Sequence, residues 1–138
     1  MEPLNESKEQ SRARTNIKNF KKMTQILYTL SILGLLPESL AKIEDLFIVD
    51  GKRVIVYEHC LGKNLLEDVL VNEQEKLPEY RVKKIVHQIL TGLRFLHSKN
   101  IFHGHMTPQC IVFDDYEAGT IKMTGFGYHT LLAKNVTN

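Results

Sequence analysis

The sequence predicts an α+β fold, in which helices and short antiparallel hairpins alternate along one chain. Two observations predict this class. Apolar residues recur at helical spacing over residues 17–30 and 82–96, and two clusters rich in β-branched residues are each interrupted by a turn signal. The chain has 138 residues, of which 43% are hydrophobic and 25% charged. These values are typical of a globular domain and exclude wholesale disorder.

Composition also excludes several classes of partner and location. The net charge of +2 provides no clustered basic face for nucleic acid. The most apolar stretch, residues 26–36, has about half of the ~20 residues that a membrane-spanning helix needs, and residues 1–16 do not resemble a secretory signal. Two cysteines, Cys60 and Cys110, are too few for a disulfide scaffold. We therefore expect a cytoplasmic chain without a membrane span or a nucleic-acid partner.

The first predicted helix begins near Asn16. Residues 1–15 lack apolar periodicity, which predicts a flexible lead-in. Thr15 or Asn16 can cap the helix that follows, and Gly34 with Pro37 can end it. Its apolar stripe recurs at three- and four-residue steps and consists of Ile17, Phe20, Met23, Leu27 and Leu30.

A hairpin is predicted next. Two β-rich runs, residues 43–49 and 53–57, flank Asp50 and Gly51, and Asp-Gly is a strong signal for a two-residue turn. Within the second run, residues 54–57 are continuously apolar. This pattern predicts a strand that is buried on both faces.

Two helices and a second hairpin complete the pattern. Asn64 and Glu67 have the spacing of a capping box, so a short helix should begin there and end in the polar stretch 72–76. Pro78 should open a long helix that Asn100 stops. The apolar face of that helix consists of Val82, Ile85, Val86, Ile89, Leu93 and Leu96. Residues 111–113 and 120–123 are predicted strands, joined by a turn over residues 114–119.

This order of elements, together with motifs in three places, resembles the protein-kinase-like fold. Residues 77–115 look like its long helix and catalytic loop, and residues 54–60 look like its last small-lobe strand and hinge. Residues 121–127 resemble the strand and turn that carry the Asp-Phe-Gly motif. The resemblance covers residues 16–133 and leaves 134–138 as a tail. It implies an incomplete fold: a partial small lobe, the hinge, and the first helices and catalytic-loop hairpin of the large lobe.

The resemblance also locates a degenerate catalytic site. In the family's His-Arg-Asp loop, the Asp accepts the substrate's proton and a later Asn holds magnesium. In this sequence His105 stands at the position of the base and Cys110 at that of the Asn. Gly125 replaces the Asp of the Asp-Phe-Gly motif. Because glycine has no side-chain ligand and a thiol suits magnesium poorly, we expect no metal site.

Residues that pack, in contrast, are retained. His103 and Phe126 match the two residues that stack in the spine joining the lobes of the family. The glycine-rich loop and the Val-Ala-Ile-Lys strand have no match. Because packing residues are retained and catalytic residues are replaced, we predict a pseudokinase that is not an enzyme. It would act through protein binding or regulation, as a truncated form of a larger protein.

The hinge leaves one binding role open. In the family, hinge backbone groups bind adenine, and Glu58 and Cys60 could keep this role whatever their side chains. Tyr57, at the gatekeeper position, is bulky and narrows that pocket. The simpler interpretation is a hinge that only connects two lobes, since polar anchors for phosphates are lacking. We therefore expect no cofactor, with weak metal-free ATP binding left open.

Simpler interpretations also apply to other residues. His103 and His105 could form a metal pair, but a third ligand is not in view, so a packed His103 is the simpler interpretation. Cys110 immediately precedes an apolar strand, which predicts a buried, inert thiol. Two alternatives to the pseudokinase remain. One is an atypical kinase that uses His105 as its base, and the other is a non-functional fragment with exposed apolar surface.

Short matches resemble one subfamily, the TBC-domain-containing kinase-like proteins. These matches are residues 16–18, 25–27, 58–60, 65–70 and 126–129. In that family a Rab-GAP-type TBC domain follows the kinase-like part. The present chain has no room for such a domain, so GAP activity is not carried over.

Overall fold

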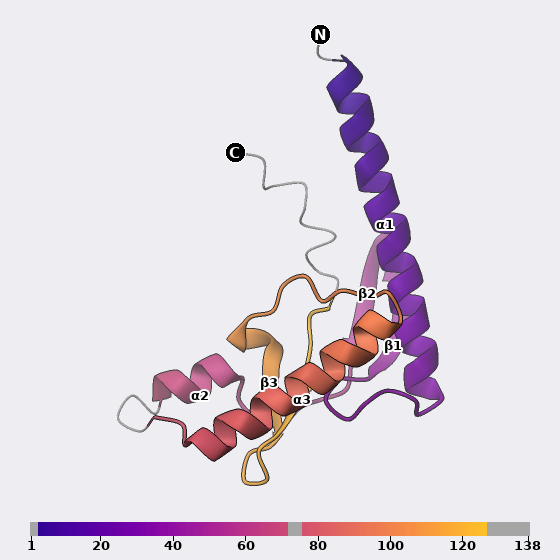
Figure 1. Cartoon of the computed structure of the whole chain (residues 1–138). Coiled ribbons are helices and arrows are strands. Elements are labelled where there is room, and N and C mark those ends of the chain that lie inside the picture. The colour runs from indigo at the N-terminus through magenta and orange to yellow at the C-terminus, as the bar shows by residue number, and fades with distance from the viewer. Residues whose placement is uncertain (1–2, 72–75, 127–138) are drawn as a thin grey trace.

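A computed structural model describes residues 3–71 and 76–126 of the chain (Figure 1). It confirms the α+β class and the predicted order of elements. The helices and strands are α1 (Pro3–Ile32), β1 (Ile43–Val49), β2 (Lys52–Tyr57), α2 (Leu65–Val71), α3 (Glu79–Ser98), the short 3-10 helix η1 (Pro108–Cys110), β3 (Ile111–Asp115) and β4 (Thr120–Met123).

Helix α1 is longer than predicted. It begins at Pro3, so the expected flexible lead-in is wrong for residues 3–15, which are helical. Thr15 does not cap the helix, because its hydroxyl donates to the carbonyl of Ser11 within it, at 3.0 Å. The absence of apolar periodicity reflects exposure of this part of α1 rather than lack of helix, since Glu, Lys, Gln and Arg are good helix formers.

Helix α1 ends where the sequence predicted. Gly34 has a φ of 67°, which few residues other than glycine adopt easily. Its N–H donates to the carbonyl of Ser31 at 3.1 Å, and the N–H of Leu35 donates to that of Leu30 at 2.9 Å. This pair of bonds is a Schellman motif, which satisfies the last carbonyls of the helix.

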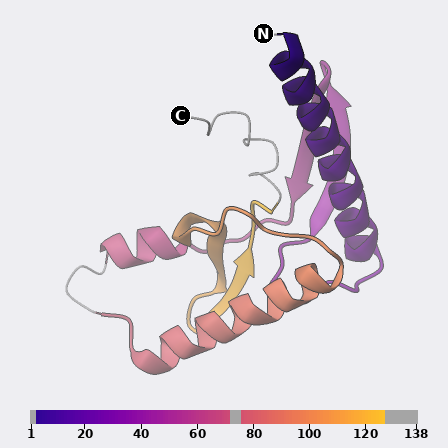
Figure 2. The same cartoon turned by 45° about the horizontal axis from the view of Figure 1, so that its top comes forward.

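The first hairpin packs beside α1 (Figure 2). Strands β1 and β2 are antiparallel, and Asp50 and Gly51 have φ values of 49° and 72°, as a type I′ turn requires. The apolar residues of β2 are only half-buried, so the prediction of a strand buried on both faces is wrong. The sheet contains two strands, and α1 packs on it.

The capping box at the start of α2 is confirmed. The N–H of Asn64 donates to Oε2 of Glu67 at 3.1 Å, and the N–H of Glu67 donates to Oδ1 of Asn64 at 2.9 Å. The polar stretch in which this helix was predicted to end lies largely outside the described residues.

Helix α3 has the predicted limits, but its apolar face is only partly covered. Ile85 and Leu96 are buried, whereas Val82 and Val86 are 41% and 44% exposed. The reason is that the β3–β4 hairpin covers one flank of the helix and leaves the adjoining row of side chains open. The predicted end at Asn100, with a φ of 56°, is confirmed.

Residues 39–41 join the two hairpins into one core. The N–H of Met123 donates to the carbonyl of Ser39 at 2.7 Å, and the N–H of Ala41 donates to that of Met123 at 3.0 Å. Around this junction pack buried side chains from α1, α3 and both strands of the second hairpin, including Leu27, Leu40, Leu96, Phe113, Ile121 and Met123. The junction thereby sets where the hinge and the catalytic loop lie.

Candidate functional site

An aromatic column connects β2 to the loop that follows α3. The ring of Phe126 meets Tyr57 and His103 edge-on, with ring centroids 5.8 Å apart in both pairs. His103 and Phe126 are both buried. The two residues that sequence reasoning assigned to packing therefore lie in contact, and Tyr57 extends the column to the hinge.

The hydrogen bonds of His103 define which of its ring nitrogens carries the proton. Its Nε2 lies 2.7 Å from the carbonyl of Thr124, and its Nδ1 accepts from the N–H of His105 at 3.2 Å. The proton therefore resides on Nε2. Burial lowers the pKa of His103, against the smaller raising effect of the Thr124 carbonyl, and His105 lowers it further. A neutral imidazole of His103 thus holds the loop after α3 against the segment after β4, through its hydrogen bond to Thr124.

The three degenerate positions come together. Cys110 Sγ donates to the carbonyl of His105 at 3.4 Å and lies 3.4 Å from the hydroxyl of Thr107. A Cβ placed on Gly125 would be 3.3 Å from the same sulfur. Cys110 is half-buried, so the prediction of a buried thiol is wrong. The sulfur faces a turn rather than the interior of the core.

These residues do not fit the magnesium site that the kinase resemblance implies. Gly125 offers no side-chain ligand, and the thiol of Cys110 is soft where Mg²⁺ prefers oxygen. Within residues 3–71 and 76–126, no group of three or more His, Cys, Asp or Glu side chains could hold a metal ion. The third residue of the predicted motif, Gly127, lies outside the described residues.

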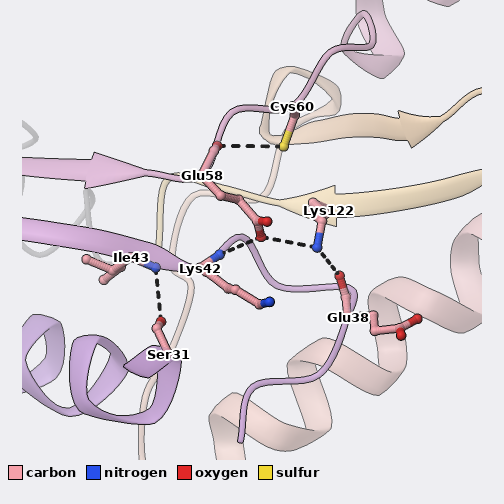
Figure 3. A network of polar contacts seen from close by, with 7 residues as sticks. All are labelled: Ser31, Glu38, Lys42, Ile43, Glu58, Cys60 and Lys122. Atoms are coloured by element: carbon pink, nitrogen blue, oxygen red, sulfur yellow. Dashed lines mark hydrogen bonds and ion pairs between the residues drawn. The ribbon is translucent and has the colours of Figure 1, made fainter. Parts of the chain in front are cut away.

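The hinge is held in place by an ion pair between the buried Lys122 and the partly buried Glu58 (Figure 3). Oε1 of Glu58 accepts from Nζ of Lys122 at 3.1 Å and from the N–H of Lys42 at 2.8 Å. Nζ of Lys122 also donates to the carbonyl of Glu38 at 3.1 Å, and its side chain is 9% exposed. The side chain of Glu58 therefore has a structural role, because its contacts connect the hinge to β4 and to residues 38–42.

Sequence reasoning missed Lys122 and Lys42. The available signal was a lysine inside the short, otherwise apolar run of β4, because a buried lysine requires a partner. The identity of that partner was not readable, since Glu58 lies in a distant segment that only the fold brings close.

The backbone groups of the hinge have fewer hydrogen-bond partners among the described residues than the side chain of Glu58 has. In the described part of the chain, no residue accepts a hydrogen bond from the N–H of Cys60. The carbonyl of Glu58 has only a long contact with Cys60 Sγ, at 4.0 Å. Partial burial, with a contribution from Glu58, raises the pKa of the Cys60 thiol. Burial likewise raises the pKa of Tyr57 to about 12, so both side chains remain protonated at neutral pH.

The comparison that decides the family is a match of residues 3–138 to the model of the protein kinase domain. The chain belongs to the protein kinase family. The match covers the hinge, the catalytic loop and the Gly125 turn, and the roles that the resemblance assigns to their residues stay predictions. The subfamily resemblance to TBC-domain-containing kinase-like proteins stays a prediction, because the relatives reported below are other protein kinases.

Two curated relatives illustrate the similarity. The mitosis inhibitor protein kinase SWE1 of Candida albicans is 40% identical over 56% of this chain. The CBL-interacting serine/threonine-protein kinase 8 of Arabidopsis thaliana is 26% identical over 90% of it. The chain spans 6% of the first relative and 27% of the second.

Solved structures support the fold. The kinase domain of Mycobacterium tuberculosis PknI matches 85% of this chain with a TM-score of 0.69 at 18% identity, and the chain covers 45% of that structure. Rad53 in complex with AMP-PNP matches 77% of this chain with a TM-score of 0.67 at 21% identity, and 27% of that structure is covered. The expectation of a partial protein-kinase fold is confirmed.

The comparisons correct one prediction. We expected a protein that is not an enzyme, but its relatives are protein kinases by name, and no described feature by itself shows loss of catalysis. The substitutions at His105, Cys110 and Gly125 therefore do not by themselves show that the site is inactive. Separately, none of the described helices has the length and apolar character needed to cross a membrane.

Proposed function

We propose that this chain is the hinge and catalytic-loop part of an atypical protein kinase, which binds adenine nucleotide at residues 58–60 and supports weak phosphotransfer. One observation carries the proposal. The hinge backbone groups, which have no strong partner among the described residues, the aromatic column and the three substituted positions lie together. They come from the ends of β2 and β4 and from the loop and short helix preceding β3, which one core joins. Rad53, a structural relative, was solved with the nucleotide analogue AMP-PNP.

Nucleotide binding would use the backbone. The N–H of Cys60 and the carbonyl of Glu58 can form a donor and acceptor pair for an adenine edge, because neither has a strong partner among the described residues. Tyr57 limits the depth of such a pocket, and its protonated hydroxyl places no charge there. An adenine ring in this position would lie against the end of the aromatic column.

Phosphotransfer would use His105. A substrate hydroxyl attacks the γ-phosphorus, the bond from that phosphorus to the β–γ bridging oxygen breaks, and ADP leaves. The hydroxyl proton passes to the imidazole of His105, which later releases it to water. The hydrogen bond from the backbone N–H of His105 to Nδ1 of His103 fixes the backbone of the loop at this point. No step of this scheme depends on the substituted metal positions.

Transfer from γ-labelled ATP to a generic protein substrate tests this function. We expect slow labelling that falls by about 10²-fold or more in His105→Ala, because a positioned base contributes about 10² to 10⁴ in rate. Lys83→Ala, on an exposed face of α3, is the matched control and should retain the rate. Equal labelling by wild type and His105→Ala, or none by either, would contradict the proposal.

A second candidate function, protein binding or regulation, is favoured by a different observation. Several large apolar side chains are more than half exposed in the described parts of α1, α2 and α3, among them Ile32, Leu70 and Leu90. Ile32 adjoins the exposed Leu33, and Leu70 adjoins the exposed Val69 and Val71. Exposed apolar groups that adjoin one another often mark interaction surfaces. The short matches to TBC-domain-containing kinase-like proteins, where a kinase-like part is attached to a larger protein, agree with this role.

A further inference from the structure

A groove runs along one flank of α1. Its deeper end is a hollow of about 350 Å³ between α1 and the loop after α3. A shallower hollow of about 330 Å³ continues along the same helix and shares Lys22 and Ile26 with the first. We call the two hollows together the α1 groove. From Asn19 to Leu30 it is about 16 Å long at the helical rise of 1.5 Å per residue, which is enough for a short peptide segment.

The floor of the α1 groove is apolar. Phe20 and Ile101 are buried beneath its deeper end. Met23, Ile26 and Leu30 follow one another at three- and four-residue steps along α1 and are only partly buried. Such a row presents a continuous apolar strip, which an apolar side chain from a partner could cover.

The rim of the α1 groove is basic. Lys22 on α1 and Lys99 after α3 are both exposed, and neither forms an ion pair within the described residues. Asn19 and Asn100 add amide groups, and no Asp or Glu lines either hollow. Lys99 Nζ lies 5.8 Å from the centroid of the Phe95 ring, but neither lysine has a carboxylate partner among the described residues. Two such cations that flank an apolar floor favour a partner with carboxylates beside apolar side chains.

The composition of residues 127–138 argues against this segment of the chain as the occupant of the α1 groove. Residues 127–138 contain no Asp or Glu and include Lys134. Their side chains therefore offer no charge that complements Lys22 and Lys99. The carboxylates that would complement the two lysines therefore do not come from this C-terminal segment.

We propose that the α1 groove docks an acidic segment of a partner protein, with its apolar side chains on the strip and its carboxylates at Lys22 and Lys99. This inference rests on the second candidate function, protein binding, and names the chemistry of the partner. It does not depend on phosphotransfer, because the groove residues are separate from the hinge and from His105.

Fluorescence anisotropy of the full chain tests the docking. The probe is a short labelled peptide in which leucine and phenylalanine alternate with glutamate, and its counterpart carries lysine in place of every glutamate. We expect the glutamate peptide to bind, with an affinity that falls as salt is added. The lysine peptide, Lys22→Glu and Lys99→Glu should each weaken binding by about tenfold or more, the factor that a loss of 1.4 kcal/mol produces.

Three controls make the result specific. Lys22→Arg keeps the charge and should keep the affinity. Lys83→Glu reverses an exposed lysine on α3, outside the groove, and should have no effect. Val86→Asp changes the exposed row of α3 instead and should also leave binding unchanged. Thermal melts of each variant check that the fold is retained.

The outcomes separate the groove from protein binding in general. Binding that survives Lys22→Glu and Lys99→Glu but is lost in Val86→Asp would overturn the groove and leave protein binding standing, on α3. Equal binding of both peptides would overturn the charge argument. Self-association of the chain that Lys22→Glu abolishes would make a second copy the occupant and overturn the proposal. Binding of neither peptide would contradict both the groove and the second candidate function.

Discussion

Lys122 and Glu58 show how one pair of residues can hold the hinge of this protein. Burying a lysine is costly unless its charge is paired and its protons are bonded. Lys122 has a carboxylate from Glu58 and a carbonyl from Glu38, on two different segments. The pair therefore specifies one arrangement of the hinge relative to β4, and its net contribution to stability is smaller than the loss caused by removing one partner.

Replacing Lys122 tests this role at the residue scale. Lys122→Met should lower the free energy of unfolding by about 1–3 kcal/mol, because it leaves the Glu58 carboxylate partly buried without its cation. Adding Glu58→Gln should restore part of the loss. Lys83→Met breaks the exposed pair with Glu79 and should change stability by no more than about 0.5 kcal/mol. Urea unfolding measures all of these. Similar effects of Lys122→Met and Lys83→Met would contradict the structural role.

Single residues of the site were predictable where a motif placed them. The resemblance to the kinase motifs implied that His103 and Phe126 pack and that His105, Cys110 and Gly125 share one site. The partners of Glu58 and the contact of Tyr57 with Phe126 were not predictable. Those contacts join segments that are distant in the chain, and periodicity carries no information about such pairs.

At the scale of elements, α3 packs closely on its neighbours at Gly92. A Cβ there would meet Met123 Cε and would lie 2.9 Å from Ser39 Oγ and 3.1 Å from Leu40 Cδ2. Helix α3 can thus approach the junction of residues 39–41 with β4 only because position 92 has no side chain. This contact sets how closely the helix approaches β4 and residues 39–40.

A larger residue at position 92 should force these elements apart. Gly92→Val should destabilise the chain by about 1–3 kcal/mol, the usual cost of overpacking a well-packed contact. Thr91→Val is the matched control, since it introduces the same side chain on an exposed face of the same helix and should stay within about 0.5 kcal/mol. The midpoints of thermal unfolding compare the two variants. A Gly92→Val variant as stable as wild type would show that the junction is not tightly packed.

Element limits were predictable at caps and turns, and less so elsewhere. The Asn64 capping box, the Asp50-Gly51 turn and the Gly34 helix end all formed as expected, because local hydrogen bonds or positive φ angles determine them. The start of α1 was wrong by several turns. Apolar periodicity detects only the part of a helix that packs, and residues 7–12 of α1 are exposed.

At the scale of the whole molecule, two antiparallel hairpins surround one hinge. The order of elements was predictable, because each element has its own period and boundary signals. The coverage of α3 was not, since Val82 and Val86 belong to an apolar row that the described residues leave open. An apolar stripe predicts which face of a helix can pack against a partner. It does not predict whether the described residues supply that partner.

The central claim for the whole molecule is that its hinge binds adenine nucleotide through backbone groups. Titration of the isotope-labelled full chain with AMP-PNP, followed by amide chemical shifts, measures this most directly. Cys60→Pro removes the N–H that would donate to the nucleotide, whereas the matched variant Cys60→Ala keeps it. Melting curves of both variants show whether the fold is retained.

The predicted result is a saturable shift of the amides of residues 57–60 and of Phe126, present in wild type and Cys60→Ala and lost in Cys60→Pro. Shifts confined to the α1 groove would contradict the account, and so would no shift at any nucleotide concentration.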